Sequence, residues 1–261
     1  MSAATTASAP AGAPLRTTPL ATAGEHLVVV VAHPDDETFG CGSLIAHAAA
    51  AGARVTVVCA TRGGAGERVP DPITDCWPLA LVREVELTSA ARVLGVGEVV
   101  LLGYRDSGFD GAVHPRALVA TPPAALAHDL GERLAALDPD VVLALDGSDG
   151  HRDHVHLRDA LTVAVAGLAR RPRLVHSSLA NSLMRRWAEE RAGTDTVYLD
   201  LDLDALGRPD DELVAIDTSS VLAVREEAIA CHRSQASPYD GLSPDLRRAF
   251  LTIDHVQELV T

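Results

Sequence analysis

The sequence predicts an α/β protein with a Rossmann-like, three-layer fold, in which helices flank a mostly parallel sheet and the active site lies at the carboxyl edge of the strands. Segments with strand and helix character alternate along the chain, and the strand segments are apolar throughout instead of alternating with polar residues. The first of them, EHLVVVVA, contains four consecutive valines. Strands without a polar side are typical of a parallel sheet that helices cover on both faces.

The alternation can be followed element by element up to residue 171. Apolar runs predict strands at residues 25–32, 54–60, 98–104 and 140–145. Helical spacing of apolar residues predicts the helices between and after them, at 37–52, 78–96, 122–139 and 153–171. Gly52 ends the first of these helices, and the third has a Pro-rich start and an Asp-Pro stop.

After Pro172 the pattern is looser. It predicts strands at 172–179, 196–203 and 213–218, and helices at 182–191 and 219–235. Ser219 or Ser220 is the expected N-cap of the last helix. No internal repeat and no Gly- or Ser-rich linker follows Gly24, so residues 25–261 are expected to form a single domain. Residues 1–24, rich in Ala, Thr and Pro, are expected to be a disordered or loosely draped segment.

Composition limits the class of protein and its partners. The 261 residues are 47% hydrophobic but only 3% aromatic, so the core must be built from Val, Leu and Ala. With 36 acidic residues against 22 basic ones, the net charge of −14 argues against nucleic acid or an anionic membrane surface as partner. No stretch resembles a signal peptide or a membrane span, and the four cysteines include no CxxC pair, which favours a cytoplasmic location. A homo-oligomer is compatible with this composition.

Unusual polar clusters follow the predicted strands. The first strand ends in HPDDE, the second in TRGGAGE, the third in GYRDSG and the fourth in DGSDGHRDH. Because open α/β sheets bind ligands at the carboxyl ends of their strands, these clusters are expected to meet at one edge of the sheet. The order of elements therefore predicts one site, built from several loops.

The HPDDE cluster indicates a bound cation. In a turn that leaves a strand, residues three apart can converge, so His33 and Asp36 can share a cation while Asp35 faces a molecule bound to it. Alternatively, the three acids Asp35, Asp36 and Glu37 only cap the following helix and interact with its positive end. Glu37, which lies nearest the helix, is expected to do so in either case.

The HRDH cluster favours the cation. It places His151 and His154 about one helical turn apart at the matching strand end, which makes His154 the expected third ligand. Two imidazoles, one carboxylate and a water form the open four-coordinate site expected of catalytic zinc. His156, in the same cluster, is expected to point elsewhere and to be structural. The remaining histidines have no comparable neighbours and are predicted to be ordinary core or surface residues: His26, His47, His114, His128, His176, His232 and His255.

Together, AHPDDE and HRDH resemble the motifs of the LmbE-like zinc-dependent N-deacetylases, the PIG-L family, which includes the N-acetylglucosaminyl-inositol deacetylase and the conjugate amidase of mycothiol metabolism. The resemblance extends to REVELTSAARVLGV, to the GYRDSG loop and to the segment ending in CHRSQ. It therefore covers most of residues 27–235. Either short motif alone would be weak evidence, but the pair in this order is highly specific.

The resemblance implies a role for each matching position. The implied zinc ligands are His33, Asp36 and His154. Asp35 would be the general base, and His151 would stabilise the oxyanion. Asp153 would be the acid that orients His151 and keeps it charged. Positions that contact the sugar in similar enzymes are matched by Arg83 and Asp106, and Arg105 adds a donor suited to sugar hydroxyls.

Two positions depart from the family pattern. Arg152 stands where the family often has proline, and Asp149 lies close to the position of a mobile tyrosine in the mycothiol-type enzymes. These departures leave the expected chemistry unchanged, but they leave the substrate open.

The expected function is that of a zinc-dependent hydrolase that removes an acetyl group from the amine of an N-acetylated amino sugar or glycoside, with Fe²⁺ as an alternative metal in the cell. An amidase that cleaves a larger sugar-thiol conjugate would use the same core residues. A catalytically silent sugar-binding relative would be expected to have lost Asp35 or a ligand, and none is missing. A nucleotide-binding Rossmann protein would have GxGxxG after the first strand, where this chain has HPDDE.

Overall fold

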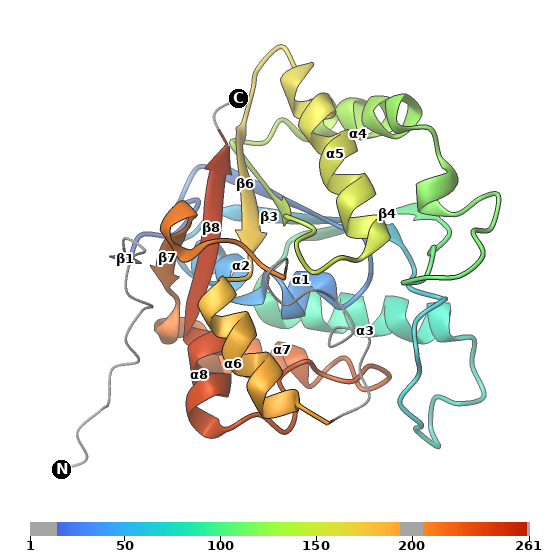
Figure 1. The fold of residues 1–261 in the computed structure, drawn as a ribbon. Helices are drawn as coiled ribbons and strands as arrows, with labels where there is room; N and C mark the ends of the chain where they lie inside the picture. Colours follow the sequence, from blue (N-terminus) through green and yellow to red (C-terminus); the bar gives the residue numbers. More distant parts are fainter. Residues whose placement is uncertain (1–14, 194–205, 260–261) are drawn as a thin grey trace.

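The four consecutive valines are the last four residues of β2 (His26–Val31), whose six residues are all buried. In the computed structural model, which describes residues 15–193 and 206–259, β2 belongs to a sheet with the strand order β1-β7-β8-β6-β5-β2-β3-β4 (Figure 1). Its other strands are β1 (Leu15–Arg16), β3 (Arg54–Thr61), β4 (Glu98–Tyr104), β5 (Val141–Leu145), β6 (Arg173–Ser178), β7 (Val214–Asp217) and β8 (Ile253–Leu259). Within the described residues β8 runs antiparallel to both of its neighbours, and the other neighbouring pairs are parallel.

Helices cover both faces of this sheet, as the apolar strands predict. One face carries α1 (Asp36–Phe39), α2 (Gly42–Ala50), α3 (Leu79–Leu94) and α7 (Leu222–Ile229), and the other carries α4 (Pro123–Leu137) and α5 (Arg152–Ala166) (Figure 1). Alternate residues of β2 serve the two layers: Val29 and Val31 pack in the core cluster of the first face, Val28 and Val30 in that of the second. Both sides of the strand are therefore removed from water, which explains why it has no polar side.

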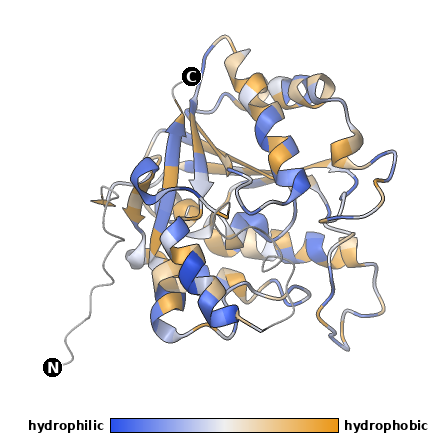
Figure 2. Cartoon of the chain, in the orientation of Figure 1, coloured by the Kyte–Doolittle hydropathy of each residue, from blue (hydrophilic) through white to orange (hydrophobic). Residues whose placement is uncertain are grey.

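A third apolar cluster lies beyond the sheet. It is formed by α6 (Asn181–Arg191), α8 (Pro244–Thr252) and neighbouring loop residues, with Trp187, Leu246 and Leu251 among its buried members. In Figure 2 the helices α6 and α8 carry both hydrophilic and hydrophobic residues, as expected of helices with one face in a core and one in water. Within the described residues, no helix combines the length and the apolar character that crossing a bilayer requires.

The predicted α/β class and the strands at 25–32, 54–60, 98–104, 140–145, 172–179 and 213–218 are confirmed. The prediction of a single helix at 37–52 is wrong. Two helices, α1 and α2, form there, and Gly40 and Cys41 separate them. The helix predicted at 219–235 is shorter, because α7 ends at Ile229 and residues 219–221 form a 3₁₀ turn. The predicted serine N-cap is also wrong, since Val221 occupies that position without a side-chain bond.

Two elements near the C-terminus were not predicted. The amphipathic helix α8 begins at Pro244, directly after the N-cap Ser243, whose hydroxyl accepts a hydrogen bond from the Leu246 amide, and the chain continues from α8 directly into β8.

The strand predicted at 196–203 lies outside the described residues. The first described residues pair at the far edge of the sheet, where β1 lies beside β7, and Leu20 and Ala21 are buried in the core.

The strand order fixes where a ligand site can form. From β2 the chain moves outward through β3 to β4, then returns to place β5 on the opposite side of β2. The reversal lies between the carboxyl ends of β2 and β5, and such a reversal leaves a crevice above the sheet. The HPDDE cluster leaves β2 and the HRDH cluster follows β5, so the two motifs meet at this reversal.

Candidate active site

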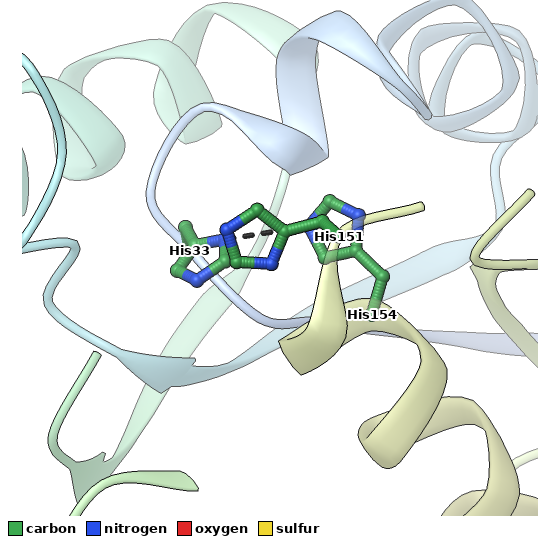
Figure 3. Close-up of side chains that lie close together, drawn as sticks. All are labelled: His33, His151 and His154. Atoms are coloured by element: carbon green, nitrogen blue, oxygen red, sulfur yellow. Dashed lines mark hydrogen bonds between the residues drawn. The ribbon is translucent and has the colours of Figure 1, made fainter. Parts of the chain in front are cut away.

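Two loops bring the predicted catalytic residues together above the reversal. His33 and Asp35 lie in the turn between β2 and α1, and Asp36 is the first residue of α1. After β5, His151 is the N-cap of α5, and the rest of the HRDH cluster forms the first turn of that helix. Figure 3 shows His33, His151 and His154 close to one another, and the ring centroids of His33 and His151 are 4.6 Å apart. His33 and His154 are 121 positions apart in sequence, but their side chains are in direct contact.

Three side-chain atoms form a nearly equilateral triangle. His33 Nδ1 lies 3.4 Å from Asp36 Oδ2 and 3.3 Å from His154 Nε2, and His154 Nε2 lies 3.2 Å from Asp36 Oδ2. Zinc in a tetrahedral site is bound at about 2.0–2.1 Å by nitrogen or oxygen, so two of its ligand atoms lie about 3.3 Å apart. The spacing of the triangle therefore fits a zinc-sized ion.

Carboxylates lie behind both imidazoles. Asp149 Oδ2 is 2.6 Å from His154 Nδ1, and Asp153 Oδ2 is 3.0 Å from His33 Nε2, with Asp106 Oδ1 at 3.4 Å from the same nitrogen. A carboxylate that accepts the proton of one ring nitrogen leaves the other nitrogen free to bind a metal. His33 accordingly presents Nδ1 to the triangle and His154 presents Nε2.

Other groupings of these residues are less suited to a cation. The carboxylates of Asp106 and Asp153 also lie near His33, but both are already occupied by donors. Asp106 accepts the amides of Ala65 and Gly108, and Asp153 accepts the amide of Ser107 at 3.0 Å and its hydroxyl at 2.5 Å. They are placed to orient His33 instead of binding an ion.

The charge balance also favours a cation. The carboxyls of Asp35, Asp36, Asp106, Asp149 and Asp153 all lie in or beside this cluster. Burial alone would lower the pKa of His154, but the carboxylates of Asp149 and Asp36 raise the pKa of this imidazole to about 10. A bound cation would offset the same negative charge without protonating the ligand nitrogens.

Asp35 is a partly exposed acid next to the triangle. Its side chain is 17% exposed, and one of its oxygens lies 2.7 Å from the buried guanidinium of Arg83. Burial raises the pKa of the Asp35 carboxyl to about 6, although the positive charge of Arg83 acts in the opposite direction. A carboxyl with a pKa near neutrality is suited to accept and return a proton.

The backbone of Asp35 is unusual. Its φ is 118° and its ψ −32°, a conformation that non-glycine residues rarely adopt. This strained turn points Asp35 and Asp36 in different directions, so that one carboxylate faces the triangle and the other meets Arg83. Strain of this kind concentrates at functional sites.

His151 is arranged as a hydrogen-bond donor. Its Nδ1 accepts the backbone amide of Asp153 at 3.1 Å, so the proton of a neutral ring must be on Nε2. Burial lowers the pKa of His151 to about 4, which keeps the ring neutral at pH 7. The expectation that Asp153 orients His151 through its carboxylate is corrected, because that carboxylate binds His33 and Ser107 and only the Asp153 amide meets His151.

The three residues predicted to contact a sugar are placed differently from one another. Arg83 is 3% exposed, and its guanidinium also donates to the carbonyls of Pro34 and Gly63. A Cβ at position 63 would collide with this guanidinium, and the φ of this residue is positive, which explains why position 63, the first glycine of TRGGAGE, is a glycine. Asp106 is buried against His33, and Arg105 is exposed at the end of β4. Contact with a sugar stays a prediction for all three.

Arg152, one of the two departures from the family pattern, holds the loop at residues 107–111. Its guanidinium donates to the carbonyls of Ser107, Gly108, Asp110 and Gly111. The remaining residue of the loop, Phe109, has its ring centroid 5.4 Å from that of His151. Residue spacing did not indicate these contacts, since an arginine in a polar motif usually has a solvated side chain.

Glu37 and His232 form a buried pair that the sequence did not predict. Glu37 Oε1 lies 2.8 Å from His232 Nε2, and both side chains are fully buried. The histidine was predicted to be an ordinary core or surface residue. Its place in CHRSQ, 195 residues from Glu37, was the only available signal, and it did not indicate a partner.

Comparison with known proteins places the chain by sequence. Residues 28–165 match the family model described as PIG-L, GlcNAc-PI de-N-acetylase. A 1D-myo-inositol 2-acetamido-2-deoxy-alpha-D-glucopyranoside deacetylase from Actinosynnema mirum is 34% identical over 238 residues, which cover 84% of each chain. The chain belongs to the PIG-L family. This membership confirms the predicted resemblance, and the relatives are N-deacetylases.

Solved structures agree with the fold. N,N'-diacetylchitobiose deacetylase from Pyrococcus horikoshii superposes with a TM-score of 0.60 at 20% identity, covering 90% of this chain and 84% of that one. GalB, the 4-carboxy-2-hydroxymuconate hydratase from Pseudomonas putida KT2440, superposes with a TM-score of 0.61 at 17% identity, covering 91% and 97%. One fold thus carries both a deacetylase and a hydratase, so the function of a PIG-L protein must be argued from its site.

Proposed function

We propose that this protein is a metal-dependent N-deacetylase that hydrolyses the amide of an N-acetylated amino sugar or glycoside. The observation that carries the proposal is the triangle of His33 Nδ1, Asp36 Oδ2 and His154 Nε2, with edges of 3.2–3.4 Å and the accessible Asp35 carboxyl beside it. Three protein ligands with an open fourth position are typical of catalytic zinc, whereas structural zinc sites have four.

The two imidazoles and Asp36 would hold zinc, with Fe²⁺ as the alternative ion. Zinc, when bound in such a site, supplies an activated water and polarises the substrate carbonyl. Asp149, Asp153 and Asp106 keep the ligand rings oriented, because each accepts from the ring nitrogen that faces away from the triangle. The resemblance of AHPDDE and HRDH to the motifs of zinc-dependent N-deacetylases supports this assignment.

Asp35 is the proposed general base. Its carboxylate accepts the proton of the attacking water and later transfers it to the departing amine nitrogen, which leaves as a free amine beside acetate. Arg83, which is fixed by the carbonyls of Pro34 and Gly63, restricts the Asp35 carboxylate to one orientation.

His151 is the proposed donor to the oxyanion that forms when the carbonyl carbon is attacked. The amide of Asp153 occupies Nδ1, so Nε2–H is the donor that remains for this oxygen. A neutral imidazole supports this role without the protonated state that the sequence suggested, since one well-placed donor contributes about 3 kcal/mol to lowering such a barrier.

The substrate class is inferred from relatives that act on N-acetylated amino sugars. Cleavage of a larger conjugate at an amide would use the same groups, so substrate size must be tested directly. The protein should be stripped of metal, reloaded with Zn²⁺ or Fe²⁺, and assayed for primary amine release from N-acetylglucosamine, N-acetylglucosaminyl glycosides and N-acyl thiol conjugates. Amine should appear only after reloading, and fastest from an N-acetylated glycoside. A metal-loaded protein that releases no amine from any of these amides would contradict the proposal.

A further inference from the structure

The HRSQ turn at residues 232–235 takes no part in the proposed reaction, yet it contacts both elements that hold Asp35. On one side His232 reaches Glu37 in α1. On the other, the amide and hydroxyl of Ser234 donate to Glu86 at 2.8 and 2.6 Å. Glu86 lies on α3, one turn after Arg83. The turn therefore connects the source of the Asp35 ion pair with the start of α1.

The conformation of Asp35 needs such support. With φ at 118° it lies outside the ordinary left-handed helical region, whereas Asp138, the other described non-glycine residue with positive φ, lies within that region at 48°. A strained backbone persists only where its surroundings hold it. The Asp35 carbonyl accepts the amides of Thr38 and Phe39, and its own amide donates to Glu37 Oε2 at 2.9 Å.

Glu37 is the group that fixes this amide, and both of its oxygens are engaged. Oε2 accepts from Asp35, while Oε1 accepts from the Thr38 hydroxyl and faces His232 Nε2. The oxygens of a fully buried carboxyl lose their contacts with water and must find partners within the protein. His232 is its closest ionisable partner, so the position of Glu37 depends on His232.

We propose that His232 is a positioning residue for Asp35: by holding Glu37 it fixes the Asp35 amide and keeps the Asp35 carboxylate aimed at the metal triangle. The inference rests on the proposed function, in which Asp35 is the base. It gives the C-terminal part of the chain a role in catalysis without any contact to substrate. The ring of His232 also packs against Phe39, with centroids 5.6 Å apart, so a purely structural role must be separated from this one.

The test compares His232→Ala with His232→Gln in the metal-loaded protein. The alanine variant should lower kcat about a hundredfold, the size of effect that a small displacement of a catalytic group can produce. KM and the metal content per chain should stay within about twofold, because the ligand triangle keeps its own contacts. The amide nitrogen of the introduced glutamine can replace the Nε2 donor, so His232→Gln should recover most of the lost kcat. His255→Gln, a change at another buried histidine on β8, should leave kcat unchanged.

Hydrogen exchange of a peptide covering residues 33–39 gives a readout that does not depend on turnover. His232→Ala should speed exchange there and His255→Gln should not. If the wild type hydrolyses an amide while His232→Ala keeps its kcat, or loses kcat only in step with its metal, the positioning role is overturned. If no amide is hydrolysed at all, the proposed function fails, and unchanged exchange in His232→Ala would separately overturn the contact. Should His232→Ala not fold, His232→Gln and Glu37→Gln provide the same comparison, with Glu37→Gln slowing turnover more.

Discussion

At the scale of single residues, the candidate metal site is defined by which nitrogen of each imidazole faces it. His33 uses Nδ1 and His154 uses Nε2, and in both cases the opposite nitrogen meets a carboxylate. The acids behind the rings should therefore contribute to metal affinity, because they fix the proton position and orientation of each ring.

Asp149 should therefore determine metal affinity. Asp149→Asn keeps the shape of the side chain but loses the charge that fixes the proton on His154 Nδ1. Metal affinity should fall about 10–100-fold, which is typical of losing a carboxylate behind a ligand histidine. Competition with a chromogenic chelator measures this change, and Asp159→Asn, at an exposed acid on α5, is the matched control. Equal affinities for the two variants would contradict the assignment.

Asp35 should affect turnover and not metal binding. Asp35→Ala removes the proposed base but none of the three triangle atoms, so the protein should still bind one metal ion per chain. Its kcat should fall by about 10²–10⁴-fold, the usual contribution of general acid–base catalysis. Metal analysis and amine release on the same sample test both statements. An active Asp35→Ala variant would remove the assigned base.

At the scale of elements, the sequence predicts the helices and strands that are marked by the pattern of neighbouring residues. The strands around the site were predicted because each is apolar on both sides, and the meeting of HPDDE with HRDH followed from strand order. The break between α1 and α2 was not predicted; it lies at Gly40, the C-cap of α1, and Cys41, the N-cap of α2. The contact of Asp153 with His33 and that of His232 with Glu37 were also not predicted. Both depend on packing between residues far apart in the sequence, which residue spacing does not encode.

The loop at residues 107–111 is the element on which Arg152 should act. Four of its five carbonyls accept from this guanidinium, so Arg152→Ala should loosen the loop beside His151 without changing the metal ligands. Losing about 1.5 kcal/mol of charged hydrogen bonding should raise KM about tenfold while kcat changes little. Hydrogen exchange of residues 105–112 and steady-state kinetics check this, with Arg158→Ala on the same helix as control. An unchanged KM would show that the loop holds its conformation without Arg152.

At the scale of the whole molecule, the fold carries an excess of acid together with several histidines that burial keeps neutral. His176 on β6 is 3% exposed, and burial lowers its pKa to about 4. Burial also lowers the pKa of His26 and His255. In the unfolded chain these imidazoles have an ordinary pKa near 6.5 and bind protons that the folded chain does not, so each of these three histidines should lower the free energy of unfolding as the pH falls.

The sign and the pH range of this effect can be stated for His176. Above pH 6.5 the imidazole is neutral in both states and contributes no pH dependence. Between pH 6.5 and about 4 the unfolded chain gains the proton first, so the free energy of unfolding falls with decreasing pH, by about 3 kcal/mol in total for a shift of this size. Below pH 4 both states are protonated and this loss is complete. His176→Leu should remove that part of the acid dependence, whereas His128→Ala, at an exposed histidine of α4, should not. Urea unfolding of metal-free samples at pH 7, 5.5 and 4.5 measures the difference, and parallel curves for His176→Leu and the wild type would contradict it.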